Sequence, residues 1–483
     1  MRQAKGAGVY NLIVIGAGTA GLVAAAGTAG LGGRVALIER NKMGGDCLNF
    51  GCVPSKALIS SARLAQRFRH ANKWALRPSE PQFEFAEVME RVRARRAQIA
   101  PNDSQERFES LGVDVFRGEA HFISPYEVAV GEARLRARNF LIATGSRATI
   151  PPVEGIDAVP YFTNETIFDR LNSKPASMIV LGGGPIGCEL GQAFARLGVK
   201  ITIIQRTAQL LPAEDSDVAQ FLHRQFQAEE IEVRLNAKAT RISRANCRTI
   251  VQLETGECIC GEALLIAAGR TPNLSALNLM AAGVKFGQAG VETNEYLQTS
   301  QRHIYAAGDV ANEFKFTHTA DFAARVVVRN VLMPLQLLRQ KVNWSVVPGC
   351  TFTDPEVAHV GLGENAARQR AIPYDSFRVD LAHVDRAVVE SEEAGFAKIL
   401  TRKGSDRILG ATIVAPHAGE LLHEFIVAMN AGIGLGRMAS MIHIYPTLAE
   451  LARKAGDQYN RTRLTPAAKK VFAWVYRRAR SAG

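Results

Sequence analysis

Apolar runs that end at small residues recur along the chain, and two of them share one pattern. Residues 11–15 and 177–181 are short apolar runs that predict buried strands. Each run is followed directly by a glycine-rich turn and a segment of helical length, and each helix leads into a second apolar run, at 34–38 and 200–204. The repeated order of strand, turn, helix and strand predicts two α/β units with parallel sheets.

The first turn has the spacing of a dinucleotide-binding fingerprint. It contains Gly16, Gly18, Ala20 and Gly21, and Glu39 stands at the end of the following strand. Such glycines let the backbone approach a pyrophosphate at a helix N-terminus, and the acid can accept hydrogen bonds from a ribose diol. This context favours dinucleotide binding over a purely structural turn.

The second turn repeats the pattern with Gly182, Gly184 and Gly187, and its helix begins near Cys188. Two units of this kind predict two dinucleotide sites. Two bound dinucleotides in one chain in turn predict electron transfer between them.

Two cysteines follow the first fingerprint by about thirty residues. Cys47 and Cys52 are separated by four residues, and a helix there would place them beside the ring that the fingerprint holds. Such a pair can accept electrons as a disulfide, and placement at a helix N-terminus lowers the pKa of a thiol. Two inert buried thiols are the less favoured interpretation.

The run at 44–56, G-G-D-C-L-N-F-G-C-V-P-S-K, resembles the redox-active disulfide of the class I pyridine nucleotide-disulfide oxidoreductases. That family includes mercuric reductase, dihydrolipoamide dehydrogenase and glutathione reductase, and the resemblance continues to about Arg461. It implies an α/β fold with two Rossmann-like dinucleotide-binding domains, arranged as in glutathione reductase, and a C-terminal α+β dimerisation domain of an obligate homodimer. The expected domains are 1–155 for FAD and the disulfide, 156–280 for NAD(P), 281–346 for the return to the FAD domain, 347–464 for dimerisation, and 465–483 for a basic amphipathic tail.

The resemblance also implies a role for each residue of the motif. Cys52 would be the thiol that faces the flavin, and Cys47 the outer thiol that attacks substrate. Lys56 would stabilise negative charge on the reduced flavin, and Glu189 would hold Lys56 in place. FAD is expected in the first unit and a nicotinamide nucleotide in the second. Further contacts to these cofactors are expected from Gly45, Asp46, Thr144, Gly145, Asp309 and Gly269.

The choice of nicotinamide nucleotide depends on the end of the second unit's second strand. Gln205 stands where NAD-preferring relatives carry an acid, and Arg206 is adjacent. Without a carboxylate, and with a cation nearby, a 2′-phosphate would be accommodated. NADPH is therefore favoured over NADH, although Arg206 could instead point into water.

One catalytic position departs from the family pattern. Disulfide reductases of this group read His-Pro-Thr near the C-terminus, with a Glu five residues after the His, whereas this chain has Tyr445 there and keeps Glu450. A phenol is a poor base near neutral pH, and His443 is a less favoured substitute. Mercuric reductases also lack this His, but no cysteine follows Cys350 to form their C-terminal pair.

Electrons are therefore expected to pass to a thiol-bound metal ion, bound transiently by Cys47 and Cys52, or to a small disulfide. The alternatives are a dihydrolipoamide dehydrogenase or another disulfide reductase, an NAD(P)H oxidase or quinone reductase, and a non-catalytic flavoprotein.

Composition narrows the remaining possibilities. The net charge is +12, but no nucleic-acid motif accompanies it, and anionic dinucleotides also favour a positive field. No structural metal site is expected, because Cys258 and Cys260 have no second pair. Without a signal peptide or membrane span, the expected location is cytoplasmic. The tail at 465–483 is expected to pack against its own dimer, with contact to an anionic membrane as the alternative.

Overall fold

The computed structural model describes residues 8–311, 313–333 and 336–481. The first seven residues of the expected FAD domain and the last two of the expected tail lie outside these ranges. The described chain divides into two compact units. The first comprises the residues up to Gln66, Glu80–Leu210 and Phe226–Trp344, and the second comprises Arg67–Ser79, Leu211–Gln225 and the residues from Ser345 onward.

The first unit contains a largely parallel sheet of strand order β3-β2-β1-β6-β5-β4, with β18 also paired to β6. The apolar runs form its central strands because a parallel sheet is buried on both faces. All residues of β2 are buried, for example. The strands are β1 (Val9–Ile15), β2 (Val35–Glu39), β3 (Asp114–Arg117), β4 (Ala120–Ser124), β5 (Glu127–Val130), β6 (Ala133–Ile142) and β18 (Ile304–Ala306).

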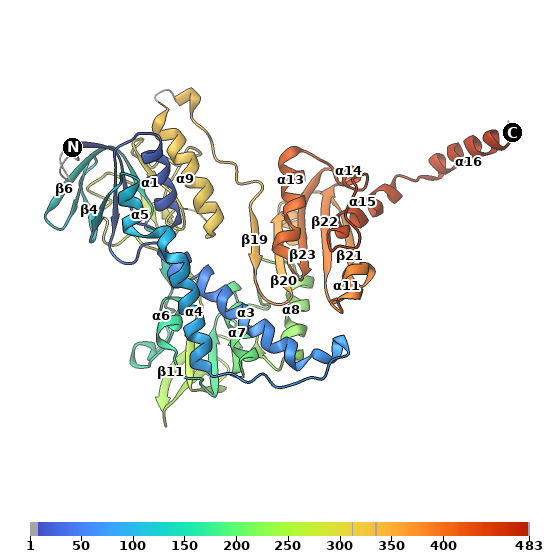
Figure 1. Ribbon diagram of the computed structural model, residues 1–483, viewed down its shortest axis with the longest axis horizontal. Helices are drawn as coiled ribbons and strands as arrows, with labels where there is room; N and C mark the ends of the chain where they lie inside the picture. The colour runs from blue at the N-terminus through green and yellow to red at the C-terminus, as the bar shows by residue number, and fades with distance from the viewer. Residues whose placement is uncertain (1–7, 312, 334–335, 482–483) are drawn as a thin grey trace. The chain divides into compact units, whose positions relative to one another are not determined.

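Two helices distant in sequence pack together beside this sheet. Helix α1 (Thr19–Gly30) follows the first glycine turn, and α9 (Thr317–Leu332) returns after β18, and the two lie side by side (Figure 1). Their apolar side chains share one buried core with β1 and β2. The chain therefore returns to the first sheet after leaving it for the second.

The second sheet of this unit has the order β10-β9-β8-β14, and its first two strands in sequence are connected through a glycine turn and a helix as in the first sheet. Helix α7 (Pro185–Arg196) follows its glycine turn. Cys258 and Cys260 lie in a separate sheet, β11-β12-β13, where both are exposed and alternate with buried neighbours along the strand. The strands are β8 (Ser177–Leu181), β9 (Lys200–Ile204), β10 (Glu232–Arg234), β14 (Ala263–Ile266), β11 (Ala239–Ala245), β12 (Arg248–Leu253) and β13 (Cys258–Gly261).

A charged helical segment separates the two halves of the first sheet in sequence. It forms α3 (Cys52–Arg69), α4 (Phe85–Ile99) and α5 (Gln105–Ser110). The helices are interrupted near residues 78–81, which no helix covers, and at Pro101, where only a 3₁₀ turn, Ala100–Asp103, forms.

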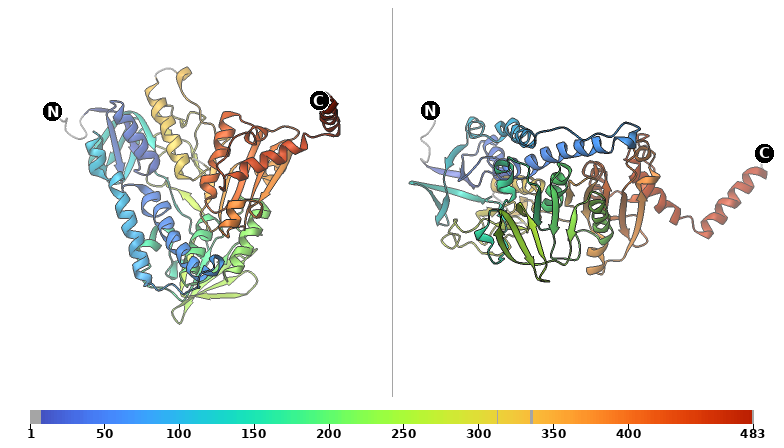
Figure 2. Two further views of the ribbon diagram at one scale, coloured as in Figure 1. Left: turned by 45° about the vertical axis from the view of Figure 1, so that its right-hand side comes forward. Right: turned by 90° about the horizontal axis from the view of Figure 1, so that it is seen from below.

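The second unit contains an antiparallel sheet of order β19-β20-β23-β22-β21, and Figure 2 shows it with helices α13 (His423–Ala431) and α15 (Glu450–Thr462). Apolar residues from the sheet and these helices form one core. The strands are β19 (Pro348–Thr351), β20 (Glu356–Gly361), β21 (Tyr374–Asp380), β22 (Phe396–Arg402) and β23 (Ile408–Ala415). The chain ends in α16 (Pro466–Ser481). Among the described residues, no helix combines the length and the apolar character needed to cross a bilayer.

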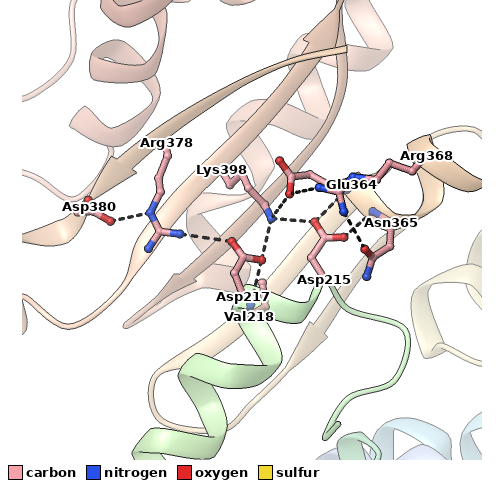
Figure 3. Close-up of polar contacts among 9 residues, drawn as sticks. All are labelled: Asp215, Asp217, Val218, Glu364, Asn365, Arg368, Arg378, Asp380 and Lys398. Atoms are coloured by element: carbon pink, nitrogen blue, oxygen red, sulfur yellow. Dashed lines mark hydrogen bonds and ion pairs between the residues drawn. The ribbon is translucent and has the colours of Figure 1, made fainter. Parts of the chain in front are cut away.

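A buried lysine fixes a distant segment to this sheet. Lys398 on β22 is 3% exposed, and its Nζ lies 2.9 Å from Asp215, 2.8 Å from Asp217 and 3.4 Å from Glu364 (Figure 3). Asp215 also accepts hydrogen bonds from the backbone N–H groups of Glu364 and Asn365, both at 2.9 Å. The start of α8 (Ser216–Ala228) is thereby attached to the C-terminal sheet.

Candidate active site

The first glycine turn can be built only with a glycine at its first position. Gly16 has φ of +106°, and a Cβ there would lie 2.4 Å from the carbonyl oxygen of Ala143. At the end of β2, the buried carboxylate of Glu39 accepts hydrogen bonds from the N–H groups of Ala17 and Asn41, both at 2.7 Å. The turn, the acid and the end of β6 therefore meet at one edge of the sheet.

A pocket opens at this edge, and its lining includes Gly16, Glu39, Gly118 and Thr144. The combination of a backbone turn without side chains and a buried carboxylate fits the adenosine half of a dinucleotide. FAD therefore fits the residues present. Glu39 would hold the ribose, and Gly16 and Gly18 would face the pyrophosphate.

The second glycine turn reproduces this geometry. Gly182 has φ of +116°, and a Cβ there would lie 2.3 Å from the carbonyl oxygen of Ala267. Gln205 is buried, and its Oε1 accepts a hydrogen bond from the N–H of Gly183 at 3.0 Å. The neighbouring Arg206 is exposed. A nicotinamide nucleotide fits this turn, with a neutral amide where the first turn has a carboxylate.

The cysteine helix lies directly against the first fingerprint. Gly45, in α2 (Gly45–Asn49), has φ of +59°, and a Cβ there would lie 2.5 Å from the Cα of Gly18. Cys47 lies on α2, and Cys52 is the first residue of α3. The close backbone contact at Gly45 thus places the dithiol beside the dinucleotide turn, as the spacing predicts.

Cys47 and Cys52 are both free thiols in this structure, and their sulfurs differ in acidity. The hydrogen bond donated by the Cys47 thiol lowers the pKa of Cys52 to about 6, with further help from Thr317 and the charge of Lys56. The Thr317 hydroxyl lies 3.4 Å from the Cys52 sulfur. The same bond, together with burial, raises the pKa of Cys47. Cys52 is therefore the thiolate of the reduced pair near neutral pH.

Lys56 and Glu189 connect the cysteine helix to the second fingerprint helix. The Nζ of Lys56 lies 2.8 Å from Oε2 of Glu189, whose side chain is 7% exposed. Lys56 stands one turn after Cys52 on α3, and Glu189 lies on α7. The ion pair that the family resemblance implied is thus formed within the first unit.

Sequence reasoning missed the buried cation between two predicted cofactor contacts. Arg270 is 12% exposed and lies 3.2 Å from Asp46 and 3.4 Å from Asp309. Ser146 donates a hydrogen bond to Asp309 at 2.6 Å. Burial raises the pKa of Asp46 even though Arg270 opposes the shift. The only sequence signal was an arginine directly after the apolar run that ends at Gly269.

Thr144, Gly145 and Gly269 lie at strand ends near this cluster. The hydroxyl of Thr144 donates to the carbonyl of Asn273 at 2.8 Å, and Gly145 has φ of +65°. Gly269 has φ of +127°, and its carbonyl accepts from the N–H of Thr149 at 2.9 Å. These three residues are therefore bound to neighbouring loops of the first unit.

In the second unit, Tyr445 does not pair with Glu450. Tyr445 is 66% exposed, and its hydroxyl donates to Asp385, on α11 (Asp385–Val389), at 2.8 Å. This hydrogen bond raises the pKa of Tyr445. Glu450 is 4% exposed and binds Arg453 at 2.8 Å through Oε1, while its Oε2 has no hydrogen-bond partner among the described residues.

His443 has its own carboxylate partner. Its Nε2 lies 2.8 Å from Oε1 of Glu424, and its side chain is 8% exposed. Its Nδ1 lies 3.1 Å from the carbonyl oxygen of Met441. The imidazole is therefore held in a fixed orientation by α13.

Comparison with known proteins identifies the family. Residues 10–324 match the pyridine nucleotide-disulphide oxidoreductase profile, and residues 347–455 match the dimerisation domain of the same family. The chain belongs to this family. The predicted family and its glutathione reductase-like fold are confirmed, and so is the oxidoreductase class. Members are FAD-dependent and use NAD(P)H, which confirms the prediction of FAD and a nicotinamide nucleotide as cofactors.

The similar proteins differ in their substrates. A mercuric reductase of Staphylococcus aureus is 32% identical over 92% of this chain and 81% of its own length. A dihydrolipoyl dehydrogenase of Chlamydia muridarum is also 32% identical, over 92% of this chain and 95% of its own. The HOCl-induced flavoprotein disulfide reductase RclA of Escherichia coli, solved also as a Cu(II) complex, is 27% identical, with a TM-score of 0.83 over 92% of this chain and 99% of its own.

Proposed function

We propose that this oxidoreductase uses electrons from NADPH to reduce a metal ion held by thiolates at Cys47 and Cys52. FAD supplies the transfer of electrons between the nicotinamide and the dithiol. The main support for the proposal comes from the state of Tyr445. Its hydroxyl donates a hydrogen bond to Asp385, and this bond raises the pKa of Tyr445. No readily ionised group replaces the family's imidazole at this position.

Chemistry connects this residue to the substrate. Reduction of a disulfide releases a thiolate that must be protonated, and imidazole does this well near neutral pH. Reduction of a mercuric ion to the metal consumes two electrons and no proton. The protein's own contribution would be two soft sulfur ligands, one of them, Cys52, a thiolate with a pKa of about 6.

The other residues would position the reacting groups. Lys56 would be held in position beside the cofactors by its ion pair with Glu189. Arg270 would fix Asp46 and Asp309 for FAD. We further propose the domain boundaries stated above and a homodimer in which Tyr445 and Glu450 serve the partner's dithiol.

A second candidate is the reduction of a small disulfide. The observation that favours it is the His443–Glu424 pair, in which a carboxylate holds an imidazole at 2.8 Å. In this candidate His443 would replace the missing histidine as acid and base.

One experiment separates the two candidates. NADPH oxidation by the purified enzyme is measured with mercuric ion in excess thiol, Cu(II), oxidised lipoamide, glutathione disulfide and a quinone. The proposal expects the fastest turnover with a thiol-bound metal ion and loss of that turnover in Cys47→Ala. Faster lipoamide or glutathione disulfide turnover that is abolished by His443→Gln would establish the second candidate instead.

A further inference from the structure

The C-terminal helix α16 (Pro466–Ser481) lies beyond the residues that match the family, and its apolar side chains are open to solvent. Val471, Phe472 and Val475 are 60%, 53% and 48% exposed. They fall at helical spacing on one face, together with Ala468 and Ala479. A solvent-exposed apolar face of this kind is a candidate interaction surface.

The opposite face of α16 is strongly cationic. Lys469, Lys470, Arg477 and Arg480 fall on it, and the guanidinium of Arg478 lies 4.7 Å from the centre of the Trp474 ring. From 465 to 483 the sequence contains no Asp or Glu. The helix therefore carries five cationic side chains and no acidic side chain.

Two aromatic residues lie along the boundaries between the faces. Trp474 and Tyr476 are 54% and 68% exposed and flank the apolar stripe on opposite sides. Amphipathic rings at such boundaries are typical of helices that lie in the interface between water and lipid. We propose that α16 binds the surface of an anionic lipid bilayer, with Val471, Phe472 and Val475 inserted among the acyl chains and the cations at the headgroups.

Charge and polarity distinguish this partner from two others. A second copy of this chain has a net charge of +12, so it is a poor partner for the five cations of α16. This charge disfavours the packing of α16 against its own dimer, which the sequence had led us to expect. A nucleic acid would pair with the cations but offers no apolar phase for Phe472 and Val475. An anionic bilayer satisfies both faces at once.

The test uses the full-length enzyme and two kinds of vesicle. Co-sedimentation with vesicles containing about one-third phosphatidylglycerol should exceed that with pure phosphatidylcholine by at least about tenfold. It should fall with added salt. The emission of Trp474, taken as the difference from Trp474→Phe, should shift to shorter wavelength only with the anionic vesicles.

Two sets of substitutions separate the faces. Neutralising Lys469, Lys470 and Arg477 to Gln should abolish binding. The matched control neutralises three exposed arginines on β6 in the same way, Arg134, Arg136 and Arg138, and should keep it. Phe472→Ser with Val475→Ser should also abolish binding while the dimer and the flavin absorbance persist.

Four results would overturn the proposal. Equal binding to both vesicle types would exclude the charge contribution. Dissociation of the dimer by Phe472→Ser with Val475→Ser would assign the apolar face to the second copy. If the enzyme does not bind vesicles at all, the helix has another role. The same follows if the variant with Phe472→Ser and Val475→Ser still binds a DNA duplex.

Discussion

The side-chain oxygen of Gln205 accepts a hydrogen bond from the backbone N–H of Gly183 at 3.0 Å. In the first fingerprint, Glu39 accepts from Ala17 at 2.7 Å in the same way and across the same separation in sequence. The two dinucleotide turns therefore share one construction and differ by a single charge. The amide nitrogen of Gln205 donates hydrogen bonds to the hydroxyl of Thr207 and the backbone carbonyl of Gln209, and these bonds hold the side chain in place.

We expect Gln205→Glu to shift cofactor choice toward NADH. The carboxylate would keep the bond to Gly183 and would repel a 2′-phosphate. The ratio of kcat/KM for NADPH to that for NADH should fall at least about tenfold. This factor corresponds to the free energy of about one charge-assisted hydrogen bond. Arg206→Ala should erode the same ratio by a similar factor. Steady-state kinetics with both nucleotides checks this, and faster turnover with NADH in the unmodified enzyme would contradict the NADPH preference.

A second prediction concerns the acidity of Cys52. The alkylation of the reduced enzyme by iodoacetamide, followed as the mass of the Cys52 peptide, should rise with pH around a midpoint of about 6. An ordinary thiol would show a midpoint near about 8.5. Cys47→Ala should raise the midpoint most, because the hydrogen bond from Cys47 is the largest cause of the shift. Thr317→Val should raise it less, and a midpoint unchanged by Cys47→Ala would refute the assignment.

The buried lysine of the second unit gives a stability prediction. Lys398→Met leaves Asp215 buried without its cation and should lower the free energy of unfolding by about 3–5 kcal/mol. Asp217→Asn, the matched control, should cost about 1 kcal/mol or less because Asp217 is 38% exposed. Urea denaturation followed by circular dichroism measures both. Equal costs for the two variants would show that burial does not govern this network.

The same network has a defined pH dependence. Burial tends to raise the pKa of Asp215, but the N–H of Asn365 and the charge of Lys398 outweigh it and lower the pKa. The stabilisation is therefore complete above the ordinary carboxyl pKa of about 3.9 and is lost as pH falls through the lowered value. Burial tends to lower the pKa of Lys398, but Asp217 and Asp215 outweigh it and raise the pKa. The stabilisation from Lys398 is therefore complete below the ordinary lysine pKa of about 10.4 and is lost as pH rises through the raised value. Lys398→Met should flatten both changes.

The sequence was most informative where a local pattern imposes the structure. The glycine turns, the buried strands of the first sheet and the cysteine spacing all follow from neighbours in the chain. The contacts it missed join distant residues. Arg270 meets Asp46, Lys398 meets Asp215, and Asp385 meets Tyr445 only after the sheets have formed. A single sequence contains no signal that pairs such residues, so their partners emerge only from the fold.

The last prediction addresses Tyr445 and the missing imidazole. Tyr445→Phe removes the hydroxyl held by Asp385 and should impair the reduction of mercuric ion several-fold, while the reduction of bound FAD by NADPH stays unchanged. Conversely, Tyr445→His should raise the turnover of glutathione disulfide near pH 7, because an imidazole titrates in this range. The Oε2 atom of Glu450 has no partner among the described residues and is available to orient the new ring. Adding Glu450→Gln to Tyr445→His should therefore remove most of the gain. Glutathione disulfide turnover by the unmodified enzyme at the rate of the Tyr445→His variant would mean that a phenol at this position does not limit disulfide reduction.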